Sequence, residues 1–209
     1  LTPPASAVAI GNFDGVHLGH RALLAHLFEA ARQHGARSTV YTFDPAPTAI
    51  VAPHRHQARI QTLENRVARL RALGVENVEV EPFTAEFAAI PAANFVTEVL
   101  RARLGVRALV VGHDFRFGRM REGDADFIHR LMPELQLVEV AAVEEGGQPL
   151  SSSRIRKLVA AGQVEAAAPL LGCDWSVSGP VVHGHARGRT LGFPTANVAQ
   201  REELMAAAG

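Results

Sequence analysis

The sequence predicts an α/β fold in which a parallel sheet carries helices on both faces, followed by the start of a small β domain. Three observations predict it. Strand-like and helical patterns alternate through most of the 209 residues, and glycine-rich or polar segments follow several of the strands. Near residue 172 this alternation gives way to a short β-ribbon pattern, WSVSGPVV, at 175–182.

Five short apolar runs predict the strands of the sheet. The second run is rich in β-branched side chains, which favour strands. The predicted strands cover residues 7–10, 38–43, 77–83, 107–112 and 136–143. Because helical segments separate them, we expect parallel strands joined by right-handed crossovers.

Apolar residues at helical spacing predict the helices between the strands. In the first helix Leu23, Leu27, Ala30 and Ala31 share one stripe, and Gly35 ends the helix. The predicted helices cover 18–34, 60–73, 92–104 and 126–132, with two shorter helices at 153–161 and 164–171. These elements together predict a Rossmann-like α/β domain.

Composition excludes several classes of protein. Basic and acidic residues number 21 each, so no basic field attracts nucleic acid. The single cysteine, Cys173, excludes an internal disulfide and is typical of a reducing compartment. No apolar run reaches transmembrane length, and the first ten residues lack a signal-peptide pattern. We therefore expect a cytoplasmic protein without a membrane or nucleic-acid partner, and its oligomeric state is not predicted.

The segment GNFDGVHLGH, at 11–20, lies between the first strand and the first helix. Free N–H groups at a helix start form an anion site, and His17 and His20 fall on one face of the first turn. Three glycines accompany them: Gly11, Gly15 and Gly19. We interpret the segment as a phosphate site. The alternatives are histidines that only pack or cap the turn, or a zinc site, which lacks further ligands at the right spacing.

A second segment, LSSSRIR at 150–156, also begins a predicted helix. Serine hydroxyls, free N–H groups and arginine forks bind phosphates, although a capping serine with solvated arginines is the alternative. Residues 11–14, 44–47 and 113–118 each follow a predicted strand. Because ligands bind outside the carboxyl ends of parallel strands, these segments predict a single site.

The motifs resemble those of a known family. The His-x-Gly-His string at 17–20 is the signature of the nucleotidyltransferase superfamily, and GNFDGVHLGH is closer still to the FMN adenylyltransferase module of prokaryotic bifunctional riboflavin kinase/FAD synthetases. SSSRIR resembles the family's Ser-Ser-Thr-x-x-Arg, with Ser153 in place of threonine. Further similar segments follow the family order: TFDPAP at 42–47, QTLENR at 61–66, GHDFRFG at 112–118 and GFPTAN at 192–197.

The resemblance implies transfer of AMP from ATP to FMN, which yields FAD and pyrophosphate. It implies His17 and His20 as catalytic residues. The ATP-binding residues that it implies are Gly11, Asn12, Phe13, Asp14, Gly19, Ser152, Ser153 and Arg156. The flavin-binding residues are Phe43, Pro45, Phe83, Asp114 and Phe115. The aromatic rings near Asp114 are as consistent with core packing as with stacking on a ligand. For QTLENR we favour a solvated helix face.

Magnesium is the one cofactor that we expect, and we expect it to arrive with the ATP phosphates. No cage of carboxylates is visible in the sequence, so no metal ligand is assigned in the adenylyltransferase part. Asp114 could contact the ribose, a magnesium ion or the flavin, and the sequence does not choose among them. The partners implied are ATP and FMN.

The C-terminal segment resembles the opening of the riboflavin kinase barrel, with Thr195 and Asn197 as ligands of the magnesium nucleotide. We expect two domains, an adenylyltransferase domain at 1–172 and an incomplete riboflavin kinase domain at 173–209. A six-stranded barrel cannot close from two strands, so phosphorylation of riboflavin is expected only with the missing part. Residues 198–209 have a helical pattern.

Two other functions remain open from the sequence. One is an adenylyltransferase for a different phosphate acceptor, of the pantetheine or nicotinate type, which the kinase-like tail argues against. The other is a non-catalytic flavin-binding remnant, which the incomplete kinase segment makes plausible.

Overall fold

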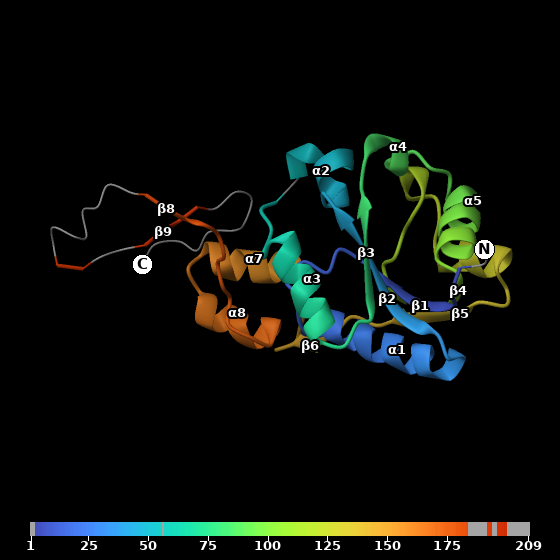
Figure 1. Cartoon of the computed structure of the whole chain (residues 1–209), viewed down its shortest axis with the longest axis horizontal. Coiled ribbons are helices and arrows are strands. Elements are labelled where there is room, and N and C mark those ends of the chain that lie inside the picture. Colours follow the sequence, from blue (N-terminus) through green and yellow to red (C-terminus); the bar gives the residue numbers. More distant parts are fainter. Residues whose placement is uncertain (1–2, 56, 184–191, 194–195, 200–209) are drawn as a thin grey trace.

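The computed structural model describes residues 3–55, 57–183, 192–193 and 196–199. Its centre is a parallel five-stranded sheet with the strand order β3-β2-β1-β4-β5 (Figure 1). The strands are β1 Ser6–Ile10, β2 Arg37–Asp44, β3 Asn77–Pro82, β4 Val106–Gly112 and β5 Gln136–Val140. The predicted α/β fold class is confirmed.

Helices connect the strands and extend beyond them. The longer α-helices are α1 Leu18–His34, α3 Leu63–Ala72, α6 Ala125–Leu131, α7 Ser152–Ala160 and α8 Val164–Leu171. The shorter α-helices are α2 Pro47–Val51, α4 Ala85–Ala88 and α5 Ala92–Asn94, and the other helical segments are η1 Pro53–Arg55, η2 Phe95–Arg103 and η3 Arg119–Arg121. Among the described helices, none is both long and apolar enough to cross a bilayer.

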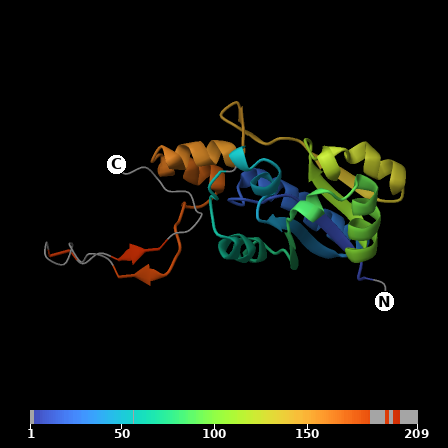
Figure 2. The same ribbon diagram turned by 90° about the horizontal axis from the view of Figure 1, so that it is seen from above.

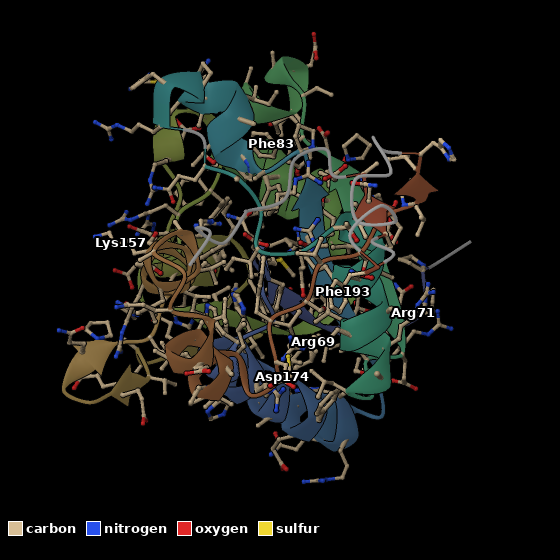
Figure 3. The ribbon with its side chains drawn as sticks, turned by 90° about the vertical axis from the view of Figure 1, so that its left-hand side faces the viewer. Arg69, Arg71, Phe83, Lys157, Asp174 and Phe193 are labelled. Atoms are coloured by element: carbon tan, nitrogen blue, oxygen red, sulfur yellow. The ribbon has the colours of Figure 1, made fainter. Side chains whose placement is uncertain are left out.

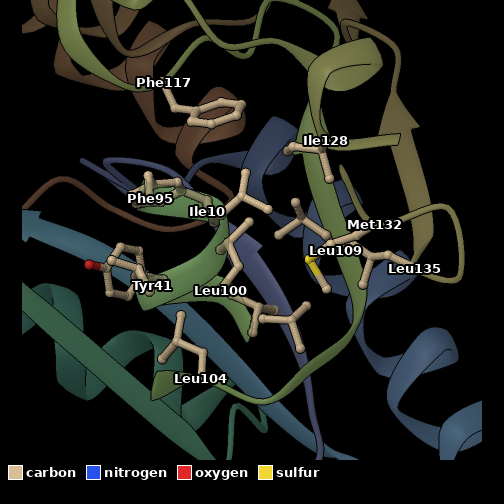
Figure 4. Close-up of a cluster of buried hydrophobic side chains, with 14 of the residues drawn as sticks. Ile10, Tyr41, Phe95, Leu100, Leu104, Leu109, Phe117, Ile128, Met132 and Leu135 are labelled. Atoms are coloured by element: carbon tan, nitrogen blue, oxygen red, sulfur yellow. The ribbon is translucent and has the colours of Figure 1, made fainter. Parts of the chain in front are cut away.

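Side chains of β1 alternate between two hydrophobic cores, which explains why helices cover both faces. Ala7 and Ala9 face the core beneath α1, which also includes Leu70 of α3. Val8 and Ile10 face the opposite core, where residues of η2 and α6 pack (Figure 4). A central strand buried on both sides is the expected consequence of a doubly covered parallel sheet.

Several elements differ from the predictions. The helix predicted at 92–104 is a short α5 followed by the wider, π-type turns of η2. The helix predicted from residue 60 begins at Leu63, because the Thr62 hydroxyl caps it by accepting the N–H of Asn65. Between the strand predicted at 38–43 and the helix predicted at 60–73, where no helix was predicted, the structure has α2 and η1. The last strand ends at Val140, three residues earlier than predicted.

Beyond the sheet lie two small antiparallel pairs. β6 Glu144–Glu145 and β7 Gln148–Pro149 form a hairpin that the sequence analysis did not predict. β8 Val181–Val182 pairs with β9 Asn197–Val198, and this ribbon extends away from the sheet (Figures 1 and 2). Of the β-ribbon pattern predicted at 175–182, only the last two residues form a strand. The domain boundary at residues 172/173 stays a prediction.

The order of the strands reverses between β1 and β4, whose following connections run to opposite sides of the sheet. Such a reversal leaves a crevice outside the carboxyl ends of the two strands. The segment after β1 begins at Gly11, and the segment after β4 includes Asp114. The fold therefore brings together two of the segments that the sequence predicts at a single site.

Candidate active site

A cavity of about 460 Å³ lies at this edge of the sheet. Its walls come from the segment after β1, the loop after β2, α3, the segment after β4 and the start of α7. The lining residues are Asn12, Asp14, Ala46, Thr48, Arg55, Gln57, Arg59, Arg66, Asp114, Ser152, Ser153 and Arg156. The cavity thus joins segments that are more than 100 residues apart in the sequence.

Arginines outnumber acids on the cavity wall. Four arginines and two aspartates line it. One of the arginines, Arg59, forms a 2.8 Å ion pair with Asp44 at the end of β2. A cavity with an excess of guanidinium groups suits an anionic ligand, since arginine forks match the oxygens of phosphates and carboxylates.

The loop after β1 holds an unusual backbone conformation. Phe13, Gly15 and Val16 have positive φ angles of 51°, 83° and 39°. Such angles are costly for a β-branched residue such as Val16 and persist only where packing enforces them. Phe13 and Val16 are fully buried, and a Cβ on Gly15 would lie 3.1 Å from the Ile60 side chain. Packing therefore fixes the approach to the first turn of α1.

His17 and His20 form a stacked pair at that first turn. Their ring centroids are 3.7 Å apart with an interplanar angle of 17°. His17 caps α1, because its Nδ1 accepts the backbone N–H of His20 at 3.3 Å. In a neutral ring this leaves the proton on Nε2, which is then a hydrogen-bond donor. The ring of Phe13 lies 4.9 Å from that of His20 and supports it from the core.

Both imidazoles are uncharged at neutral pH. Burial, together with the cations Arg156 and Arg69, lowers the pKa of His17 to about 4. Burial also lowers the pKa of His20 well below its usual value, and His17 and the nearby arginines act in the same direction. The pair is therefore equipped to donate hydrogen bonds rather than to act as cations.

The structure places the histidines beside the cavity and not in its wall. His17 is only 5 % exposed, and neither ring is among the lining residues. The capping alternative thus describes His17 correctly, but it does not account for His20. Nδ1 of His20 is buried and has no hydrogen-bond partner among the described residues. A buried polar atom without a partner is rare and indicates a ligand or water position.

Asp14 connects the two motif segments. Its carboxylate forms a 2.6 Å ion pair with Arg156 of α7, and both of its oxygens accept the N–H of Ile60 at 3.1 Å. The hydroxyl of Ser152 donates to the Asp14 carbonyl at 2.9 Å. Asp14 therefore holds the start of α7 against the loop after β1, while it also faces the cavity.

Five of the eight predicted ATP-binding residues line the cavity: Asn12, Asp14, Ser152, Ser153 and Arg156. The side chain of Phe13 does not, because it packs in the core beneath α1. Gly11 and Gly19 are not in the wall either. A Cβ on Gly19 would lie 3.1 Å from a carbon of the His17 ring, so this glycine makes room for the imidazole.

The predicted flavin residues divide into two groups. Asp114 is exposed and lines the cavity. Phe43 and Phe83 meet edge to face, with ring centroids 5.5 Å apart, and both are half-buried. Phe115 instead stacks on Phe117 at 5.4 Å, at the border of a core. Neither Pro45 nor the three rings line the cavity. Figure 3 shows Phe83 at the end of the molecule near α2.

Arg66 corrects one sequence interpretation. The segment 61–66 was expected to form a solvated helix face, but Arg66 is 5 % exposed. Its guanidinium donates to the carbonyls of Asn12 at 2.8 Å and Phe43 at 3.0 Å, so it ties β1 to β2 at the site. The helical spacing contained the signal, since Arg66 lies one turn before the buried Leu70. Burial lowers the pKa of Arg66 without removing its charge.

Ala46 lies in the segment 44–47 that was predicted to be at the site. Other lining residues were missed: Thr48, Arg55, Gln57 and Arg59, which come from the long connection between β2 and α3. None of the quoted motifs covers residues 48–60. Of the kinase-like residues, Asn197 lies in β9, and Thr195 lies outside the described residues, as do residues 200–209.

No group of three or more histidines, cysteines or acids that would hold a metal ion by itself occurs in the described part of the chain. Magnesium often takes only one or two carboxylates and completes its shell with phosphate oxygens and water. The cavity offers Asp114 for this purpose, since Asp14 is already committed to Arg156 and Ile60. The residues present thus fit a magnesium ion that is carried by a polyphosphate.

Comparison with known proteins identifies relatives over most of the chain. Residues 2–154 match the family model described as FAD synthetase, and residues 171–209 match the model described as riboflavin kinase. The bifunctional riboflavin kinase/FMN adenylyltransferase of Escherichia coli K12 is 40% identical over 199 residues, which cover 94% of this chain and 64% of that protein. The chain spans less than two thirds of such relatives.

Other relatives agree with this match. The protein of the same name from Pseudomonas fluorescens is 41% identical over 191 residues, covering 90% of this chain and 61% of that protein. A crystal structure titled as a macrolide-efflux protein from Streptococcus pneumoniae matches with a TM-score of 0.87 and 33% identity, covering 99% of this chain and 68% of the other. On the family-model match and these identities, the chain belongs to the FAD synthetase family.

Proposed function

We propose that this chain transfers the AMP unit of ATP to FMN, forming FAD and releasing pyrophosphate. The observation that carries the proposal is the arginine-rich cavity at the reversal point of the sheet, with the neutral imidazole pair beside it. Family membership supports it, since the matched relatives are named FMN adenylyltransferases. Because the reaction consumes ATP, we also propose a cytoplasmic location.

The start of α7 is the proposed seat of the ATP phosphates. Ser151 caps this nine-residue helix by accepting the N–H of Arg154. The N–H groups of Ser152 and Ser153, at the first two positions of the helix, have no acceptor within it. Ser153 is exposed and lines the cavity, and Arg156 reaches it from one turn further along. These donors neutralise charge on a triphosphate without a covalent step.

The imidazole pair is the proposed contact for the reacting phosphate. An oxygen of the FMN phosphate attacks the α-phosphorus of ATP in line, and the bond to the leaving pyrophosphate breaks. A phosphate monoester is already ionised near pH 7, so no strong general base is required. His17 donates through Nε2–H and His20 through its unpartnered Nδ1 to the oxygens on which charge builds up, and desolvation strengthens each hydrogen bond.

A magnesium ion bound with ATP would be held on the protein side by Asp114, and it would neutralise charge on the phosphates. Arg66 and Arg59 keep the loop after β2 in place at the same wall. Phe43 and Phe83, whose rings meet beyond this loop, are the proposed contacts of the flavin ring. Stacking on such rings is favourable for a flat aromatic ligand.

The test is a comparison of acceptors. The purified chain is incubated with ATP and one acceptor at a time: FMN, a phosphorylated pantetheine or nicotinate mononucleotide. We expect FAD and pyrophosphate with FMN and no pyrophosphate with the other two. Pyrophosphate release with another acceptor would replace the proposal, and flavin binding without any pyrophosphate would show a non-catalytic flavin-binding protein.

A second activity rests on a separate observation, the match of residues 171–209 to the riboflavin kinase model. We propose that the protein phosphorylates riboflavin where this segment is part of a closed barrel, with Thr195 and Asn197 as its nucleotide contacts. Incubation of a protein in which the segment is part of a closed barrel with riboflavin and ATP tests this activity. FMN formation that is lost in Asn197→Ala would support the assignment, and FMN formation that survives the change would contradict it.

A further inference from the structure

One short stretch of backbone, residues 57–60, is fastened at three points. Arg156 donates from Nε to the carbonyl of Ala58 at 3.0 Å. The carboxylate of Asp14 accepts the N–H of Ile60 at 3.1 Å. The carbonyl of the same residue accepts a hydrogen bond from the indole Nε1 of Trp175 at 3.2 Å. Ile60 is therefore held on both sides of its backbone.

The third fastening comes from outside the α/β sheet. Trp175 follows α8 and packs against the small core that contains Ile60 and Leu171. A second cavity, of about 240 Å³, separates this segment from α3, and Arg69 and Asp174 are among its lining residues (Figure 3). Further along the segment, Asn65 of α3 donates to the hydroxyl of Ser178 at 3.0 Å. The stretch 172–178 is thus docked along α3.

The fastened stretch belongs to the nucleotide cavity. Gln57 and Arg59 line it, and Arg156 donates to Asp14, to the carbonyl of Ala58 and, at 3.3 Å, to the side-chain oxygen of Gln57. A phosphate group that binds Arg156 competes with all three of these acceptors. When the arginine turns toward a phosphate, Asp14 and Trp175 are left to hold the stretch in place.

We propose that Trp175 is a positioning residue for nucleotide binding, which acts by pinning the Ile60 carbonyl. Pinning this carbonyl restrains the backbone of Ile60, whose own N–H orients the Asp14 carboxylate, and Asp14 in turn sets the position of Arg156. The segment that leads into the kinase-like region is thereby coupled to the adenylyltransferase cavity. The inference rests on the proposed function, because it takes ATP as the ligand of that cavity.

The first experiment removes only the donor. Trp175→Phe keeps an aromatic ring but loses the indole N–H, whereas the control Ser178→Ala loosens the same segment without touching Ile60. Calorimetric titration of the full chain with ATP is expected to show a roughly two- to tenfold weaker affinity for Trp175→Phe, the range for one neutral hydrogen bond. The expected affinity of Ser178→Ala is that of the unmodified chain.

A double-mutant cycle separates positioning from general destabilisation. In an Arg156→Gln background, Trp175→Phe should no longer change ATP affinity, since its route to the ligand passes through Arg156. Equal effects in both backgrounds, or equal effects of Trp175→Phe and Ser178→Ala, would overturn the inference. If the chain binds ATP but makes no FAD, the proposed reaction fails while this cycle can still be read.

The unmodified chain supplies a second measurement that needs no variant. Trp175 is its single tryptophan, so emission excited selectively from tryptophan reports on this side chain alone. We expect ATP to change the emission in a saturable way, with the dissociation constant that calorimetry gives. Emission that stays constant at saturating ATP would show that Trp175 does not sense the cavity.

Discussion

Two helix starts meet at the site, and they differ in almost every physical respect. α1 begins with a histidine cap, a stacked uncharged imidazole pair and a strained, buried loop. α7 begins with a serine cap, an exposed Ser153 and a charged Arg156 in the cavity wall. The N–H groups at a helix start therefore lie in a buried, uncharged environment at α1 and in an exposed, charged environment at α7.

The difference assigns different tasks to the two helix starts. Desolvated neutral donors are strong where charge develops on a reacting group, because little water competes with them. Exposed serines and a paired arginine recruit and orient a highly charged ligand. Changes at α1 are therefore expected to reduce the rate of reaction, and changes at α7 to reduce nucleotide affinity.

The largest expected effect is that of His20→Ala. We expect FAD formation to fall by about 100- to 1,000-fold, the usual cost of losing one donor to a transition-state oxygen. The control is His26→Ala, an exposed histidine further along the same helix. Rates are compared at saturating ATP and FMN, and circular dichroism checks the fold. Full turnover by a folded His20→Ala chain would remove the imidazole pair from the mechanism.

Arg156→Gln is expected to act on nucleotide binding. It removes a charged donor from the cavity, so we expect the KM for ATP to rise by roughly 10- to 100-fold with a smaller change in kcat. Arg154→Gln is the matched control, since Arg154 lies on the same helix but donates to carbonyls of the β6–β7 hairpin. Similar KM values for the two variants would place the ATP phosphates elsewhere.

Stability should depend on pH through the buried imidazoles. The folded pKa of His17 is about 4, below the unfolded value of about 6.5, so the unfolded chain binds more protons between these two pH values. The free energy of unfolding should therefore fall by up to about 1.4 kcal/mol per pH unit for this group as the pH drops through that window.

His17→Asn isolates this contribution. Asparagine is an effective N-cap that does not titrate, so the variant should lose less stability over the same pH range. Denaturant unfolding at several pH values between about 4 and 7 measures both slopes. Parallel slopes for the two chains would mean that His17 titrates normally in the folded state.

The smallest effect is expected for Arg66→Lys. One ammonium cannot reproduce the fork that reaches the carbonyls of Asn12 and Phe43, so we expect a loss of roughly 1–3 kcal/mol of stability. Arg71→Lys, on the exposed side of α3, is the control and should be neutral. Thermal unfolding compares them, and an equal midpoint for both variants would return Arg66 to the role of a surface residue.

Much of the fold followed from the sequence, because periodicity and burial agree in this chain. All five strands of the sheet were predicted, and the alternation of β1 shows why a continuous apolar run marks a strand covered on both faces. The misses are local. The wide turns of η2 keep the helical spacing of buried residues, and the β6–β7 hairpin turns on two glycines inside a polar segment.

The site was predicted in part, and the part that was missed depends on tertiary contacts. Motif residues on α7 and after β1 line the cavity as expected. The sequence analysis gave the capping role of His17 only as an alternative, and it gave no reason to expect that Asp14 would pair with Arg156, 142 positions away. Arg66 is a charged residue inside an apolar helical stripe, a pattern that indicates burial. The sequence analysis interpreted it as part of a solvated face, which was wrong.

The most direct test of the account is the stoichiometry of the reaction with the unmodified chain. FMN and ATP are supplied in excess with magnesium, and FAD and pyrophosphate are measured over the same time course. The account predicts that both products accumulate in a one-to-one ratio. Release of ADP or phosphate without FAD, or flavin binding without pyrophosphate, would contradict it.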